Sequence, residues 1–137
     1  MAVHYYTEDC AFVFGNRRKV NRWIGESIAA EGLKRGEISI IFCSDGYLLG
    51  INRKHLNHDY FTDIITFDYR EGSLVSGDLF ISVDTVRSNA LQFGVSFEEE
   101  LRRVVIHGVL HLCGYGDKSP GEAEVMRSKE DFYLARL

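Results

Sequence analysis

The chain has 137 residues, of which 45% are hydrophobic, and 20 acidic against 16 basic side chains give it a formal charge of -4. This length and composition suit one compact domain that can bury a core without disulfides or a structural metal. The charge excludes an indiscriminate polyanion binder, because basic side chains normally supply most non-specific affinity for nucleic acids. A local basic groove is still compatible with it, although each basic cluster is more simply explained as an exposed face. The clusters are Arg17 to Arg22, Arg53 with Lys54, and Arg102 with Arg103.

The first 83 residues carry four apolar segments of strand character, with one helical segment among them. The strands are predicted over residues 3–6, which is the weakest, 37–44, 63–70 and 77–83. Apolar residues at helical spacing predict a helix over residues 18–31, which Gly32 can end in a left-handed conformation. The turn-rich EGSLVS between the last two strands favours a hairpin.

Helical signals follow the last strand. A helix is predicted from Asp84 as its cap to Gly94, and Ser96 with Glu99 then matches a capping box ahead of a long helix over residues 97–112. A cap, a first-turn proline and an acidic residue predict the start of a final helix at Ser119, Pro120 and Glu122. Strands gathered early, with helices before and after them, indicate an α+β fold: a small mixed sheet of about four strands covered by helices, in a single domain.

The cysteines indicate a reducing compartment. Cys10, Cys43 and Cys113 are odd in number and form no CxxC pair, and the first residues lack a basic segment followed by an apolar run. No apolar segment approaches the roughly 20 residues that a membrane helix needs. We therefore expect a soluble cytoplasmic protein with no membrane partner.

The predicted long helix carries a candidate metal site. His107 and His111 lie four residues apart, so both imidazoles project from one face and can bind a single ion. Gly114 can end the helix and turn the chain back, which brings the carboxylate of Asp117 to the same ion. Three such ligands leave zinc one open position for water, whose pKa zinc lowers to about 7. Ordinary helix and turn residues are the alternative, but the glycine and the third donor favour one Zn²⁺ ion in a hydrolase domain over residues 1–137.

Gly108 and Cys113, which are close to the two histidines in the sequence, limit the reactions and ligands expected of the metal site. Position 108 is glycine, whereas zinc proteases of the HExxH type carry their general base there. A protease mechanism therefore lacks its proton acceptor, and a small residue is expected to leave space beside the ion for a bulky group such as a phosphate. Cys113 lies on the wrong side of the helix to be a ligand, and we expect it to pack.

The segment HGVLHLCGYGD, residues 107–117, resembles the signature HGxLHLxGYDH of the YbeY-type endoribonucleases of bacterial ribosomal RNA maturation. Seven of the nine specified positions match, and the two differences are Gly116 and Asp117. Asp117 stands where the family has its third histidine. The segments NRKHLNHDYFTDIITFD and GDLFIS also resemble family motifs, and Met126 with Glu130 fall where the family's last helix carries similar residues. The resemblance thus spans roughly residues 48–130.

The resemblance implies a zinc-dependent, single-strand-specific endoribonuclease in ribosomal RNA maturation, including 16S rRNA 3′ end processing and ribosome quality control. It implies single-stranded RNA, in particular ribosomal RNA, and the ribosome or its subunits as partners. Residue spacing supports the metal ligands but does not indicate RNA. The general acid stays open: His58 and His55 have suitable intrinsic pKa values, and His58 is our candidate catalytic residue, with an exposed loop histidine as the equal alternative.

Two departures from the family pattern affect the chemistry. A carboxylate at Asp117 should make the metal a weaker Lewis acid than three imidazoles would. The family usually has an arginine after an aromatic residue, where this chain has His55 and Leu56. Three nearby side chains could replace that cation: Arg53, Lys54 and His58.

Other residues and functions remain open. Asp63 and Asp78 are expected to cap turns, with support of a metal ligand as the alternative. Tyr60 and Phe61 are the aromatic residues most available for base stacking. Two rival functions are a metalloprotease-like hydrolase and a non-catalytic zinc-containing ribosome-assembly protein, and a fourth protein ligand in place of water would favour the latter.

Overall fold

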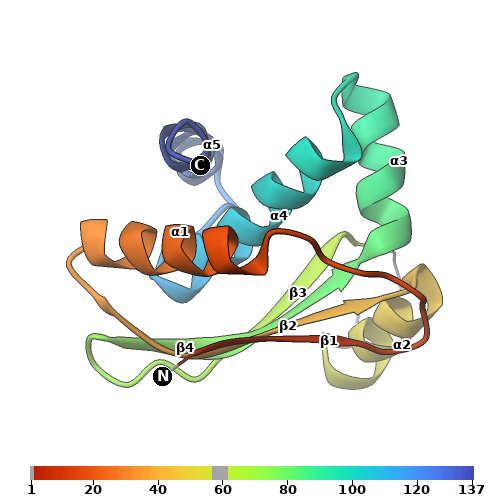
Figure 1. The fold of residues 1–137 in the computed structure, drawn as a ribbon, viewed down its shortest axis with the longest axis horizontal. Coiled ribbons are helices and arrows are strands. Elements are labelled where there is room, and N and C mark those ends of the chain that lie inside the picture. The colour runs from red at the N-terminus through yellow and green to blue at the C-terminus, as the bar shows by residue number, and fades with distance from the viewer. Residues whose placement is uncertain (1, 57–61) are drawn as a thin grey trace.

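Four strands form one mixed sheet in the order β1-β2-β4-β3 (Figure 1). They are β1 (Val3–Thr7), β2 (Lys34–Cys43), β3 (Ile64–Asp68) and β4 (Leu74–Ser82). β1, β2 and β4 run parallel, and β3 pairs antiparallel with β4, which confirms the predicted hairpin. The structure is a computed structural model that describes residues 2–56 and 62–137. The predicted α+β class, with a small mixed sheet in a single domain, is confirmed.

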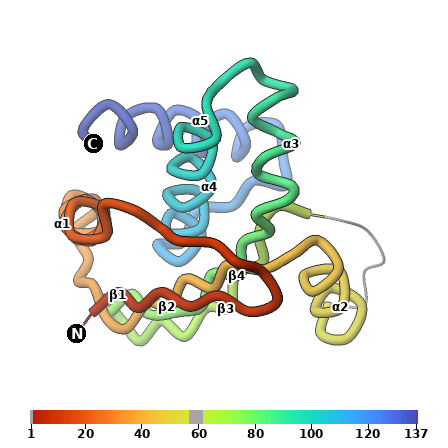
Figure 2. The backbone as a smooth tube through the Cα atoms, turned by 45° about the vertical axis from the view of Figure 1, so that its right-hand side comes forward, coloured from red at the N-terminus to blue at the C-terminus, as the bar shows by residue number. Residues whose placement is uncertain are grey.

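Helices cover the sheet unequally (Figures 1 and 2). They are α1 (Arg17–Ala30), α2 (Asp45–His55), α3 (Val83–Phe93), α4 (Phe97–Leu112) and α5 (Pro120–Leu134). α1 and α4 lie over one face, α5 packs on the outer side of α4, and α3 stands at one end of the sheet. α2 packs a smaller cluster, around Leu48 and Ile65, on the opposite face. Within the described residues, no helix has both the length and the apolar character needed to cross a bilayer.

The sequence-based prediction misses α2 and misplaces one cap. Two glycines within α2 lower its helix propensity, and only Leu48 and Asn52 of this helix are buried, so its hydrophobic periodicity is weak. The cap of α3 is Ser82, whose hydroxyl accepts a hydrogen bond from the backbone N–H of Thr85, so the assignment of Asp84 as the cap is wrong. Asp84 lies instead in the first turn, where its charge favours the positive end of the helix.

The caps of α4 and α5 are found where local sequence predicts them. The side chain of Ser96 accepts from the backbone N–H of Glu99. Ser119 and Glu122 form a reciprocal capping box at α5, with Pro120 in the first turn. These caps mark where both helices begin.

Gly108 marks the closest approach of α4 to the sheet. A Cβ atom built on Gly108 would lie 2.7 Å from Cδ1 of Ile64 and 3.0 Å from Cδ2 of Leu79. The missing side chain is therefore directed into the core rather than toward the histidines. The expectation that Gly108 opens space beside the ion is wrong, because its small size is needed for packing.

Candidate metal centre

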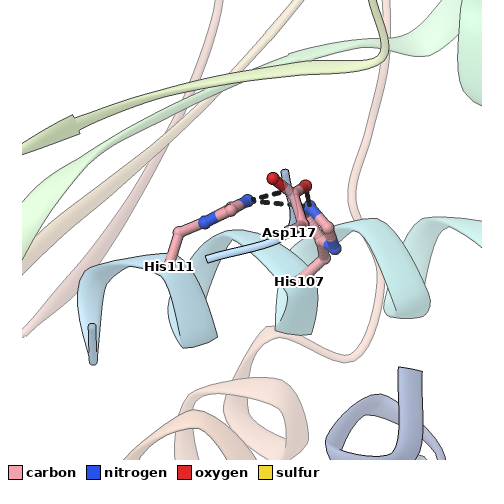
Figure 3. Close-up of side chains that lie close together, drawn as sticks. All are labelled: His107, His111 and Asp117. Carbon is pink, nitrogen blue, oxygen red and sulfur yellow. Dashed lines mark hydrogen bonds and ion pairs between the residues drawn. The ribbon is translucent and has the colours of Figure 1, made fainter. Parts of the chain in front are cut away.

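Three side chains from α4 and the loop after it converge on one point (Figure 3). The Nε2 atoms of His107 and His111 lie 2.9 Å apart, and Oδ2 of Asp117 lies 3.2 Å from each of them. One potential ligand atom of each residue lies within 4.8 Å of the others, so the three residues form a group that could hold a metal ion. The residues that the sequence analysis singled out are brought together by the fold.

The turn after α4 places the third member of this group. Gly114 has a φ of 109°, a conformation that side chains with a Cβ rarely adopt. Its N–H donates to the carbonyl of His111, and the N–H of Tyr115 donates to that of Leu110, which is a Schellman motif. The chain thereby reverses beside the last turn of α4, and Asp117 faces the histidines.

The outer nitrogen of each imidazole determines what the inner one can do. Nδ1 of His111 lies 2.8 Å from the carbonyl oxygen of Tyr115, which can only accept, so this nitrogen carries the hydrogen. Nδ1 of His107 lies 2.6 Å from the carboxylate of Glu130 and likewise donates. In the neutral form of each imidazole, Nε2 then keeps a lone pair, which is the tautomer that binds a metal.

Negative charges around His107 also favour the binding of a cation at this site. Glu130 is 5% exposed and accepts from Arg103 at 2.8 Å as well as from His107. Burial raises the pKa of Glu130, but the hydrogen bonds from His107 and Arg103 outweigh burial and keep it below its usual value. Burial lowers the pKa of His107, yet the hydrogen bond to Glu130 and the negative charges of Asp117 and Asp63 raise it overall.

This donor set fits a bound cation. Two imidazole lone pairs and a carboxylate oxygen converge, and without a positive charge between them they would repel one another. Two nitrogen donors and one oxygen donor suit zinc and leave one of its four positions for another ligand. Cys113 is not a member of the group and packs against the main core, as expected.

A cavity of about 310 Å³ opens beside the group. His107 and Asp117 form part of its lining, together with the charged side chains of Asp63, Glu100, Arg103 and Arg127. A substrate in this cavity would therefore lie against His107 and Asp117, two of the three donors.

The two aspartates outside the motif differ from expectation. Asp63 does not serve only as a turn residue: its side chain lines the cavity, and burial raises the pKa of its carboxyl group. Asp78 lies within β4 and lines a hollow with Ser39 and Tyr69 instead, so its assignment as a turn cap is wrong. Asp63 is thus the aspartate available to the site.

The loop residues named in the sequence analysis fall partly outside the described structure. His58, Tyr60 and Phe61 lie outside the described residues. His55 is the last residue of α2 and packs edge-on against Phe67, with 6.1 Å between the ring centroids. It is not among the residues that line the cavity.

Two basic side chains that the sequence analysis did not assign to the site line the cavity. Among the residues that the structure describes, Arg103 of α4 and Arg127 of α5 line the cavity, and Arg53 and Lys54 do not. Their spacing in the sequence is the signal that could have identified these arginines. Arg103 and His107 are four residues apart on α4, and Arg127 and Glu130 are three residues apart on α5. That spacing shows a shared face but not which partner the face meets.

Comparisons with known proteins show the family of the chain. A family model described as Endoribonuclease YbeY matches residues 6–137. Proteins named Endoribonuclease YbeY from Bacteroides thetaiotaomicron and Parabacteroides distasonis are each 53% identical to the chain. The alignment covers 98% of this chain and 98% of the first relative, and 100% of this chain and 96% of the second.

The fold has a counterpart among solved structures. The solution structure of TM1509 from Thermotoga maritima superposes with a TM-score of 0.67 at 26% identity, over 96% of this chain and 86% of that one. A fold, a converging donor group and full-length sequence similarity thus lead to one assignment. The chain belongs to the Endoribonuclease YbeY family.

Proposed function

We propose that this protein is a zinc-dependent endoribonuclease that cleaves single-stranded RNA. Its substrate is ribosomal RNA, including the 3′ end of 16S rRNA, in the ribosome or its subunits during maturation and quality control, which places its action in the cytoplasm. The observation that carries the proposal is the convergence of His107, His111 and Asp117, two of which, His107 and Asp117, line an open cavity. Family membership supports RNA as the substrate class.

Each residue of the site has a distinct part in this proposal. His107, His111 and Asp117 hold the ion, while Glu130 and the Tyr115 carbonyl keep both imidazoles in the binding tautomer. When bound, zinc supplies Lewis-acid activation of water and offsets negative charge on the phosphoryl oxygens. The cavity admits the phosphodiester, and His58 is the candidate general acid.

Two observations weigh against the rival functions. A glutamate at position 108, where a protease carries its base, would collide with Ile64 and Leu79. A purely structural zinc site normally has four protein ligands, and no fourth histidine, cysteine or carboxylate joins the group within residues 2–56 and 62–137. The open coordination position therefore favours catalysis.

The test combines metal analysis with cleavage of a defined RNA. Wild-type protein should contain one zinc ion and cleave a single-stranded RNA, but neither its duplex form nor casein. His111→Ala should lose metal and cleavage together, and a chelator should reproduce that loss in the wild type. Cleavage at the wild-type rate by a metal-free His111→Ala protein would rule the proposal out.

A further inference from the structure

Two hollows adjoin beside the metal centre. The first is the cavity of about 310 Å³ that His107 and Asp117 line. The second, of about 640 Å³, is lined by the end of α3, the first turns of α4 and the end of α5. The residues that line both hollows are Phe93, Glu100, Arg103 and Arg127. Because these residues line both, the two hollows are neighbours, and we call the two together the α3–α5 groove.

The groove presents an exposed aromatic ring. Phe93 is the last residue of α3 and is 58% exposed. No other aromatic ring packs against it in the part of the chain that the structure describes. An exposed ring in a lined hollow offers a flat apolar surface, which is what an unpaired base stacks on.

The groove also presents a cation whose hydrogen-bond donors are available. Arg103 is engaged by Glu130 at 2.8 Å and by Asp131 at 2.7 Å. Arg127 is exposed and forms no hydrogen bond or ion pair with any of the described residues. Its guanidinium can therefore bind a phosphate without giving up an existing partner.

The carboxylates of the groove reduce, but do not remove, its attraction for phosphate. Burial and the nearby charge of Asp63 raise the pKa of Glu100, although the charges of Arg103 and Arg127 act to lower it. Glu99 also lines the second hollow, where Arg102 is paired with Glu98 at 2.5 Å. Positive charge is thus concentrated at Arg127, which suits one phosphate rather than a long polyanion.

We propose that the α3–α5 groove binds the stretch of single-stranded RNA next to the cleaved phosphate, with a base stacked on Phe93 and a backbone phosphate on Arg127. The inference rests on the proposed function, because it takes the metal centre as the place of cleavage. It makes the α3–α5 groove the surface that selects unpaired RNA. A paired base cannot offer its face to Phe93, which gives the preference for single strands a physical cause.

The first test measures KM for a single-stranded RNA of about ten nucleotides, a length within the range that single-strand binding folds cover. Phe93→Ala should raise KM by about 5-fold or more, the loss expected for one stacked base, with a smaller change in kcat. Phe93→Tyr, which keeps an aromatic ring at this position, should have the wild-type KM. Leu91→Ala is the control, since Leu91 is 82% exposed on α3 but lines neither hollow.

The second test measures the salt dependence of RNA binding by stopped-flow anisotropy, before turnover. One lost phosphate contact lowers the slope of log K against log salt by about 0.7 for a single strand. Arg127→Ala should show this change and Arg127→Lys should largely keep the wild-type slope. Arg18→Ala, an equal charge change at an exposed position of α1 outside the groove, should leave the slope as it is.

The outcomes separate this inference from the proposed function. Wild-type cleavage with unchanged KM and salt slope in Phe93→Ala and Arg127→Ala would overturn the groove alone. Absence of RNA cleavage by the zinc-loaded wild type, with binding that still depends on Phe93 and Arg127, would overturn the nuclease assignment but retain the RNA-binding groove.

Discussion

Glu130 of α5 and His107 of α4 are joined by a 2.6 Å contact between Oε2 and Nδ1, across 23 positions of sequence. Because Glu130 is buried and negatively charged, it fixes the tautomer of His107 and raises its basicity toward a metal. The same carboxylate is held by Arg103, so α4 and α5 are tied together at the metal centre. The affinity for metal therefore depends on the packing of two helices.

Glu130→Gln should weaken metal binding while leaving all three proposed ligands in place. A neutral amide can still accept from His107 but supplies no charge, and loss of such an outer partner typically lowers metal affinity about 10- to 100-fold. Competition with a chromophoric chelator would measure the change. Asp131→Asn is the matched control, because Asp131 also binds Arg103, at 2.7 Å, but does not touch His107. Equal affinities in both variants would contradict this role of Glu130.

Asp117→His tests what the carboxylate contributes. Three imidazoles should make the bound metal a stronger Lewis acid, so the rise of kcat with pH should move to lower pH than in the wild type, with one ion still bound. Asp117→Ala should instead lose more than about 100-fold in metal affinity, since a direct ligand matters more than its outer partners. Metal content by mass spectrometry and pH–rate profiles would distinguish the variants. An unchanged profile in Asp117→His would show that Asp117 does not tune the site.

Gly108→Glu should destabilise the fold rather than create a protease. The new side chain would enter the core beside Ile64 and Leu79, and burying an unpaired charge with overpacking should cost about 3 kcal/mol or more of unfolding free energy. Urea denaturation would measure this loss. Gly50→Glu is the control, because nothing lies within 4 Å of a Cβ built at this exposed position of α2.

Glu31→Gln should lower stability in a pH-dependent way. Glu31 accepts from the hydroxyl of Tyr115 at 2.5 Å, from the hydroxyl of Tyr133 and from Lys129 at 3.2 Å. Burial raises the pKa of Glu31, but these hydrogen bonds and the charge of Lys129 outweigh burial and lower it overall. At neutral pH the substitution should cost about 1–3 kcal/mol, as expected for a hydrogen-bonded charge.

The sign of this pH dependence follows from the lowered pKa of Glu31. Its stabilisation is full above the unfolded-state pKa, near 4.5, and is lost as the pH falls through the lower folded-state value. Denaturation curves of wild type and Glu31→Gln should therefore differ most near pH 7 and converge below about pH 4.5. A gap that stays constant into acid would show that the charge of Glu31 contributes nothing.

Features of this protein that depend on residues close together in the sequence could be predicted from the sequence. Ser96 and Ser119 cap their helices through contacts three residues away, and the His107–His111 spacing reports one helix face directly. Gly114 needs only its own φ to turn the chain. Such features are local, so a single sequence contains them. α2 escaped prediction because its two glycines lower its helix propensity and only two of its residues are buried, which leaves little hydrophobic periodicity to detect.

The sequence alone thus determined the fold class, the helix that bears both histidines and the turn that returns Asp117 to them. Only the tertiary structure decided that Glu130 supports His107, that Asp63 and Arg127 line the cavity, and that Gly108 is directed into the core. The physical reason is that helical periodicity specifies a buried face but not the partner that buries it. Partners that far apart in sequence are chosen by packing of the whole domain.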